Sequence, residues 1–239
     1  MKAIKVNLPR DIKTAEIHIF ADLHIGDNHC DILGIKNRIE AVKNNKNAYC
    51  ILNGDIINNA TKTSVSDSYA EELSPMEQIE RFVEIFEPIK NKIIAITSGN
   101  HENRTYNKEG IDITQICAKQ MGLEDRYSKT GAIIFLRIGD KKGKTHKDQQ
   151  VCYMIYSTHG SGGGRKEGAK AIRLADMSNI IDADIYIHSH THLPMVIKEA
   201  YYRTDSKNSC FAIVDKLLNS APEVIAIVLL LAVLFTVIR

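Results

Sequence analysis

Short apolar runs alternate along the chain with segments whose apolar residues recur every three or four positions. The runs predict buried strands at residues 16–20, 49–52, 92–97 and 184–187. The helical spacing predicts helices at residues 32–45, 74–91, 111–120 and 167–178. Strands that alternate with helices in this way indicate the α/β class of fold.

Local signals sharpen two parts of this pattern. Ser74, Pro75 and Glu77 form a complete helix start, with serine as the N-cap, proline at the first helical position and glutamate at the third. Residues 132–138 and 151–157 flank a basic turn and predict an antiparallel hairpin. The predicted fold therefore includes antiparallel pairing beside its α/β units.

Polar residues directly follow three successive predicted strands. The pairs are Asp22 and His24, Asp55 and Asn58, and Asn100 and His101. In open α/β sheets, ligands bind at the carboxyl ends of the strands. We therefore expect these side chains to meet at one site.

The last predicted strand runs into three histidines at alternate positions, His188, His190 and His192, before Pro194 stops it. Alternate side chains of an extended chain share a face, so all three are expected to point the same way. Histidines at such close spacing favour a metal site. The polar residues after the earlier strands supply the carboxylates that such a site needs.

Five short motifs occur in order between residues 15 and 194. They are Asp22-x-His24, Gly54-Asp55-x-x-Asn58, Gly99-Asn100-His101-Glu102, Thr158-His159-Gly160 and Ser189-His190-Thr191-His192. This set resembles the calcineurin-like metallophosphoesterase superfamily, and most closely its small single-domain members in phages and bacteria. Ser189 stands where the family usually has glycine, a small-for-small exchange that we expect to be tolerated. The resemblance implies a metallo-dependent phosphatase-like α/β fold, a four-layer αββα sandwich of two mixed β-sheets flanked by helices.

The resemblance also implies two divalent metal ions. The implied ligands are Asp22, His24 and His192 for the first ion, Asn100, His159 and His190 for the second, and Asp55 as the bridge between them. His188 has no role in the family, and we expect it to pack in its strand or behind the ligands. Carboxylate, imidazole and amide ligands suit borderline divalent ions. We expect Mn²⁺ first, with iron, Zn²⁺ or Ni²⁺ as alternatives.

Catalytic roles are implied for His101 and Asp55. His101 is expected to face the leaving-group oxygen rather than a metal ion. Relatives often carry a carboxylate that orients this histidine, and here that position is Asn58, whose amide accepts a hydrogen bond without adding charge. Arg104 and Arg165 are candidate contacts for the substrate phosphate.

The implied reaction is hydrolysis of phosphate mono- or diesters, with direct attack by a hydroxide that bridges the two ions. Basic residues in the hairpin turn and after residue 164 favour a polyanion, so a nuclease-like action on nucleic acid is our preferred substrate class. An interaction module of the same fold that retains metal without catalysis is the alternative. The sequence indicates no protein partner.

Composition adds few restrictions. The chain has 239 residues, 44% of them hydrophobic, and a formal charge of +2, which suits a globular protein and by itself neither favours nor excludes a nucleic-acid binder, because local basic patches matter more than the sum. Its five cysteines are odd in number and form no C-x-x-C pair, so we expect reduced thiols and a cytoplasmic protein. The first ten residues predict no signal peptide.

The C-terminal segment departs from this pattern. Residues 224–238 carry no charge and are apolar except for Thr236. A spanning helix needs about 20 apolar residues, so the run is short for one. We divide the chain into a metallophosphoesterase domain at 1–214 and an atypical hydrophobic tail at 215–239. Three interpretations of residues 224–238 stay open: a membrane anchor, a helix buried against the body or in an oligomer, and an altered chain end.

Overall fold

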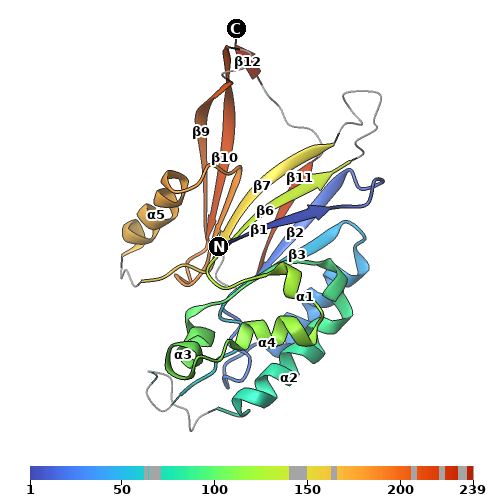
Figure 1. The fold of residues 1–239 in the computed structure, drawn as a ribbon, viewed down its shortest axis with the longest axis vertical. Coiled ribbons are helices and arrows are strands. Elements are labelled where there is room, and N and C mark those ends of the chain that lie inside the picture. The colour runs from blue at the N-terminus through green and yellow to red at the C-terminus, as the bar shows by residue number, and fades with distance from the viewer. Residues whose placement is uncertain are drawn as a thin grey trace.

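The computed structural model places two β-sheets face to face. It describes residues 1–61, 64, 71–139, 150–162, 166–205, 209–220, 224–230 and 236–238. Helices cover the outer faces of the sheets, and Figure 1 shows α5 on the side of the strands away from α1 and α2. The expected α/β sandwich with helices outside two mixed sheets is confirmed.

The smaller sheet holds the predicted α/β units. Its order is β11-β2-β3-β4-β5, with β2, β3, β4 and β5 parallel and β11 antiparallel to β2. The strands are β2 (Thr14–Phe20), β3 (Ala48–Asn53), β4 (Ile93–Thr97), β5 (Tyr127–Ser128) and β11 (Val224–Leu230). The helices of this half are α1 (Ile32–Asn44), α2 (Pro75–Phe86), α3 (Asn100–Glu109), α4 (Ile113–Gln120) and the short 3₁₀ segments η1 (Glu87–Lys92) and η2 (Glu124–Arg126).

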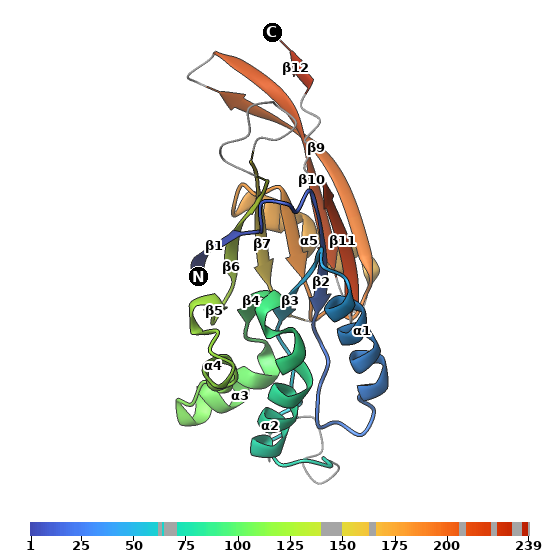
Figure 2. The ribbon, with the colours of Figure 1, turned by 90° about the vertical axis from the view of Figure 1, so that its right-hand side faces the viewer.

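The larger sheet is built around the predicted hairpin. Its order is β1-β6-β7-β8-β10-β12, and β9 pairs with β10. The strands are β1 (Lys2–Asn7), β6 (Ala132–Ile138), β7 (Val151–Thr158), β8 (Ile185–His188), β9 (Met195–Asp205), β10 (Cys210–Ser220) and β12 (Thr236–Ile238). Helix α5 (Glu167–Asp176) and the 3₁₀ segment η3 (Met177–Asn179) pack on this sheet. Figure 2 shows the β9–β10 hairpin extending beyond the rest of the sheets.

Three apolar clusters define the layers. One lies between the sheets and includes Ile17, Ile51 and Ile134. The second packs α1, α2 and α4 onto the opposite face of the smaller sheet through residues such as Phe82. The third lies under α5, around Tyr186. Each strand of the centre is thus buried on both faces, which explains why its sequence is a continuous apolar run rather than an alternating one.

Most predicted elements are present with small shifts at their ends. The capping box of α2 is confirmed, because the Ser74 side chain accepts from the Glu77 N–H and the Glu77 carboxylate accepts from the Ser74 N–H. The predicted helix over 74–91 is divided into α2 and η1, where Pro88 removes an amide donor. Residues 100–109, for which the apolar pattern predicts no helix, form α3.

The C-terminal apolar run is a strand where the structure describes it. Residues 224–230 form β11 and pair with β2 along its whole length. The buried-helix interpretation is therefore wrong for these residues, and the membrane anchor is not supported. The physical reason is composition: Val224, Ile225, Ile227 and Val228 are β-branched and favour strands. No helix among the described residues is long and apolar enough to cross a bilayer. The domain boundary expected after residue 214 falls inside β10.

Candidate metal centre

The loops that leave five strands converge at the carboxyl-terminal edge of the two sheets. Asp22 and His24 follow β2, Asp55 follows β3, and Asn100 begins α3 directly after β4. From the larger sheet, His159 follows β7, and His190 and His192 follow β8. Both sheets therefore contribute side chains to one site, as the pattern of polar residues after strands predicts.

The backbone at this site is held in an uncommon conformation. Seven described residues other than glycine have positive φ, and five of them are predicted ligands. Those five are Asp22, His24, Asp55, His190 and His192, with φ between 49° and 67°. Such a conformation costs about 1–3 kcal/mol per residue and persists where the surroundings enforce it. The loops are thus shaped for the side chains that they present.

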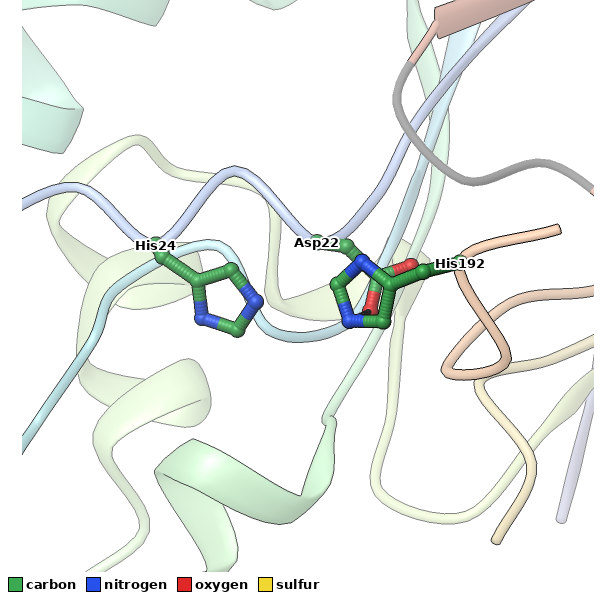
Figure 3. Close-up of side chains that lie close together, drawn as sticks. All are labelled: Asp22, His24 and His192. Carbon is green, nitrogen blue, oxygen red and sulfur yellow. Dashed lines mark ion pairs between the residues drawn. The ribbon is translucent and has the colours of Figure 1, made fainter. Parts of the chain in front are cut away.

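Three predicted ligands form what we call the outer group: Asp22, His24 and His192. Their ligand atoms lie within 4.8 Å of one another. Figure 3 shows the His192 ring beside the Asp22 carboxylate, with His24 coming from the same loop as Asp22. His192 Nε2 is 3.5 Å from Asp22 Oδ1. Asp22 Oδ1 and His24 Nδ1 are buried and have no hydrogen-bond partner, which is the state of atoms that a cation would satisfy.

A second set, the inner group, contains Asp55, His159 and His190, also with ligand atoms within 4.8 Å of one another. His159 Nε2 lies 3.1 Å from Asp55 Oδ2 and 3.1 Å from the side-chain oxygen of Asn100. His159 Nδ1 donates to the Asn53 carbonyl at 2.8 Å, which orients the ring so that Nε2 faces the site.

The two groups adjoin through Asp55. Its ligand atom also lies within 4.8 Å of those of His24 and His101. Asp55 is 1% exposed, and its Oδ1 accepts the main-chain N–H of His101 at 2.8 Å. Asp55 therefore lies between the inner group and the His24 ring of the outer group.

Burial and close charges shift the pKa values of this site in opposite directions. Burial raises the pKa of Asp22 to about 7, beyond the opposing effect of His159. Burial also acts on Asp55, but the hydrogen bond and charge of His159 outweigh it and hold the pKa of Asp55 well below its usual range. In return, Asp55 outweighs the burial of His159 and raises its pKa to about 9. Burial and the neighbouring His101 lower the pKa of His24 to about 4.

His101 sits beside these groups with both ring nitrogens engaged. Its Nδ1 is 2.8 Å from the carbonyl oxygen of Asn58, and its Nε2 is 2.9 Å from Nη2 of Arg104. A carbonyl only accepts and a guanidinium only donates, so His101 is neutral with its proton on Nδ1. Burial lowers its pKa, consistent with that form.

Comparison with known proteins agrees with this geometry. A family model of calcineurin-like phosphoesterases matches residues 23–194. The chain belongs to the calcineurin-like phosphoesterase family. A search of the curated proteins finds no match for the chain.

Two solved structures are similar to this calcineurin-like chain at low sequence identity. A protein of unknown function from Aquifex aeolicus is 14% identical, covers 75% of this chain and 80% of its own, and has a TM-score of 0.31. A conserved uncharacterized protein from Streptococcus pneumoniae, described as a predicted phosphoesterase, is 14% identical and has a TM-score of 0.33. The match covers 86% of this chain and 98% of that protein.

The calcineurin-like phosphoesterase family is metal-dependent, and the donor set of this member fits metal ions. Carboxylate, imidazole and amide oxygen are ligands for borderline divalent cations. The unpartnered Asp22 Oδ1 and His24 Nδ1 support the same conclusion, because buried polar atoms otherwise find hydrogen bonds.

Asn58 acts differently from the expectation drawn from other calcineurin-like proteins. Its main-chain carbonyl, not its amide, contacts His101. The amide nitrogen donates to Glu71 Oε1 at 2.9 Å and to Asp27 Oδ2 at 3.3 Å. The Asn58 side chain thus points away from His101 and toward the carboxylates of Asp27, which precedes α1, and Glu71, which precedes α2.

His188 does not share a face with the other histidines of its loop. β8 ends at His188, and the left-handed φ of His190 and His192 breaks the extended geometry that the alternation assumed. His188 is 5% exposed and packs against Gly160, where a Cβ would lie 2.1 Å from its Nε2. The three histidines therefore do not all point the same way, and the burial of His188 agrees with the packing role expected for it.

Glu102 has a structural role that its motif did not indicate. This 2% exposed carboxylate accepts four main-chain N–H groups. Oε2 accepts from Asp55 at 3.1 Å and Gly99 at 2.9 Å, and Oε1 accepts from Ile56 at 2.7 Å and Ile57 at 3.2 Å. Glu102 therefore ties the loop of Asp55 to the start of α3.

The two loops joined by Glu102 touch so closely that only glycine fits at their contact. A Cβ at Gly99 would lie 2.1 Å from Asp55 Oδ1, and one at Gly54 would lie 2.7 Å from the Gly99 Cα.

Arg104, the first candidate phosphate contact, lies beside the site on α3. Arg165, the second, and the lysines of the predicted hairpin turn at 140–149 lie outside the described residues.

Proposed function

We propose that this protein is a phosphoesterase that uses two divalent metal ions to hydrolyse phosphate mono- or diesters. The observation that carries the proposal is the arrangement of the outer and inner groups around Asp55, next to His101 and Arg104. Outer-group side chains would hold one ion, the inner group with Asn100 the other, and Asp55 would contact both. When bound, the ions supply Lewis acidity at the phosphoryl oxygens and an activated water as nucleophile.

The neutral form of His101 suits a role at the leaving group. Its Nδ1 proton is held by the Asn58 carbonyl, so Nε2 is the atom that faces the reaction. Arg104 Nη2 donates to His101 Nε2 at 2.9 Å, and Arg104 Nη1 donates to the Asn58 carbonyl at 3.3 Å. A phosphate oxygen would compete for the guanidinium, which binds phosphates through paired N–H donors. Arg104 thereby places positive charge where the leaving oxygen becomes negative.

We also propose that the substrate is a nucleic acid, on the basis of the basic residues in the sequence. Two of them have internal partners. Lys170 Nζ donates to the Thr191 carbonyl at 2.7 Å, and Arg173 donates to the Ser161 carbonyl. These two side chains hold the histidine loops in place, so the polyanion surface would depend on Lys166, Arg165 and the hairpin turn.

A substrate panel tests the proposal. Metal-free protein is reloaded with Mn²⁺ and assayed on p-nitrophenyl phosphate, bis(p-nitrophenyl) phosphate, single-stranded DNA and RNA. We expect hydrolysis of at least one ester, with nucleic-acid cleavage that falls steeply as salt rises. Activity on the small esters alone would reject the nucleic-acid part. Loaded protein that is inert on all four substrates would favour the non-catalytic interaction module.

Arg104→Met tests the role of the guanidinium. Removing one charge-stabilising donor costs about a hundredfold in kcat. Lys108→Met is the matched control, since Lys108 lies on the same helix and contacts Thr61 at the surface. Both variants should bind Mn²⁺ as the wild type does, and only Arg104→Met should lose kcat. Equal rates for the two variants would exclude the proposed role.

A further inference from the structure

Asn53, the last residue of β3, joins both sheets through its side chain. The amide is fully buried and makes four hydrogen bonds. Its nitrogen donates to the Thr158 carbonyl at 2.9 Å and to the Ser189 hydroxyl at 2.8 Å. Its oxygen accepts from the hydroxyls of Thr97 at 2.9 Å and Ser157 at 2.8 Å. Every donor and acceptor position of the amide is used, so the ends of β4, β7 and β8 are held at set positions around it.

Ser189 is the one residue of the five motifs that departs from the usual pattern, and it is the partner of Asn53. It is fully buried at the turn between β8 and His190. Its N–H donates to the His159 carbonyl at 3.1 Å, and its own carbonyl accepts from Thr191 at 2.7 Å. Without the hydroxyl, one N–H of the Asn53 amide would be buried with no acceptor, an arrangement that carries a desolvation penalty.

Asn53 is bonded to one member of the inner group and lies next to the segments that carry the other two. The main-chain carbonyl accepts from His159 Nδ1 at 2.8 Å. The side chain holds Ser189, the residue before His190. Asp55 follows two residues later on the same chain segment. Because the four bonds of the Asn53 amide are between neutral groups, they act on position rather than on charge.

We propose that Asn53 and Ser189 form a positioning pair for the inner metal ion. Their hydrogen bond fixes the turn that presents the His190 side chain beside Asp55 and His159, so that the three ligand atoms keep one spacing. The pair contacts neither substrate nor ion. This inference rests on the metal site of the proposed function.

The test compares Ser189→Ala with Ser157→Ala. Each variant removes one hydroxyl from the Asn53 amide and leaves it three hydrogen bonds, so both should lower the melting temperature of the metal-free protein by a similar amount. The two serines differ in their place. Ser189 accepts from the amide nitrogen of Asn53 and directly precedes His190, whereas Ser157 donates to the amide oxygen from within β7. The metal-free wild type and both variants are titrated with Co²⁺, and binding is measured by calorimetry and by visible absorption.

We expect Ser189→Ala to weaken one of two Co²⁺ binding steps by about tenfold or more and to change the absorption band, as loss of residues that orient ligands does. Ser157→Ala should keep both affinities within about twofold, since it leaves the ligand loop bonded. Ser189→Ala with the binding of the wild type, or an equal loss in Ser157→Ala, would overturn the positioning role alone. Absence of Co²⁺ binding by the wild type would overturn the proposed function and this inference with it.

Discussion

The outer and inner groups are built to different degrees of rigidity. In the inner group, Asp55 is 1% exposed and His159 is 2% exposed, and both make hydrogen bonds within the protein. In the outer group, the His192 side chain is 57% exposed, and Asp22 Oδ1 and His24 Nδ1 have no hydrogen-bond partner. The inner group is thus organised before an ion binds, whereas the outer group is completed by one.

This difference predicts unequal behaviour of two chemically similar sites. A preorganised site loses little freedom on binding and should hold its ion more tightly. An exposed histidine at the outer site must give up rotamer freedom when it becomes a ligand. We therefore expect the outer ion to exchange faster, and the following changes test that contrast from the largest expected effect to the smallest.

Asp55→Asn should weaken both the inner and the outer site, and so remove the difference between their affinities, because Asp55 adjoins both groups. The amide keeps the oxygen that accepts from His101 but removes the negative charge that pairs with His159. We expect kcat to fall by at least about a hundredfold, a loss typical for removal of a charge-stabilising group. Metal content should fall below two ions per chain by plasma mass spectrometry. The control His29→Gln alters an exposed histidine near the same loops and should retain both ions.

Glu102→Gln should loosen the inner group through its backbone. A glutamine amide replaces one acceptor oxygen with a donor, which would face two main-chain N–H groups in a buried site. Each buried group left unsatisfied costs about 1–3 kcal/mol, so we expect a loss of about 3 kcal/mol in the free energy of unfolding of the metal-free protein. Urea unfolding measures it. A loss below that of Glu77→Gln, at the exposed cap of α2, would contradict the role given to Glu102.

His192→Ala and His190→Ala should separate the two ions. Removing His192 leaves the inner group intact, so one Mn²⁺ should still bind with the affinity of the tighter site. Removing His190 acts on the inner group and should weaken that tighter step, by about tenfold or more for loss of one ligand. Calorimetric titration distinguishes the steps. If His192→Ala instead removes the tighter ion, the assignment of rigidity to the groups is reversed.

Metal affinity should rise with pH. The pKa of Asp22 is raised to about 7 and that of His159 to about 9, so near neutral pH both groups retain protons that a cation must displace. Affinity is therefore lowest below pH 7 and increases as the pH passes through these values, by about tenfold per unit for each proton released. Titrations at pH 6, 7 and 8 measure the slope. A flat profile would contradict these shifts.

The positions of the ligands were predictable because both signals are local. A buried strand is an apolar run, and the polar residue after it is adjacent in the sequence, as at Asp22 and Asp55. The alternation of His188, His190 and His192 was less informative, because an alternating pattern carries no information on the left-handed backbone of His190 and His192. Helix α3 was missed because the buried side chain of its ten residues is a carboxylate, Glu102, so it has no apolar period.

The residues that support the site could not be predicted for a different reason. Asn53 and Ser189 are 136 residues apart, and the bond between them exists only once the two sheets have packed. Glu102 likewise acts on main-chain groups 45 to 47 residues away, which no side-chain pattern marks. The pairing of β11 with β2 joins segments about 200 residues apart in the chain, so the apolar run at 224–230 did not indicate it either.

The most direct test of a shared two-ion site is Mn²⁺ loading followed by metal analysis and electron paramagnetic resonance on the same sample. We predict two Mn²⁺ per chain with the spectrum of a spin-coupled pair, and loss of that spectrum in Asp55→Asn. One Mn²⁺ per chain, or two with spectra of isolated ions, would contradict a pair of adjoining sites around Asp55.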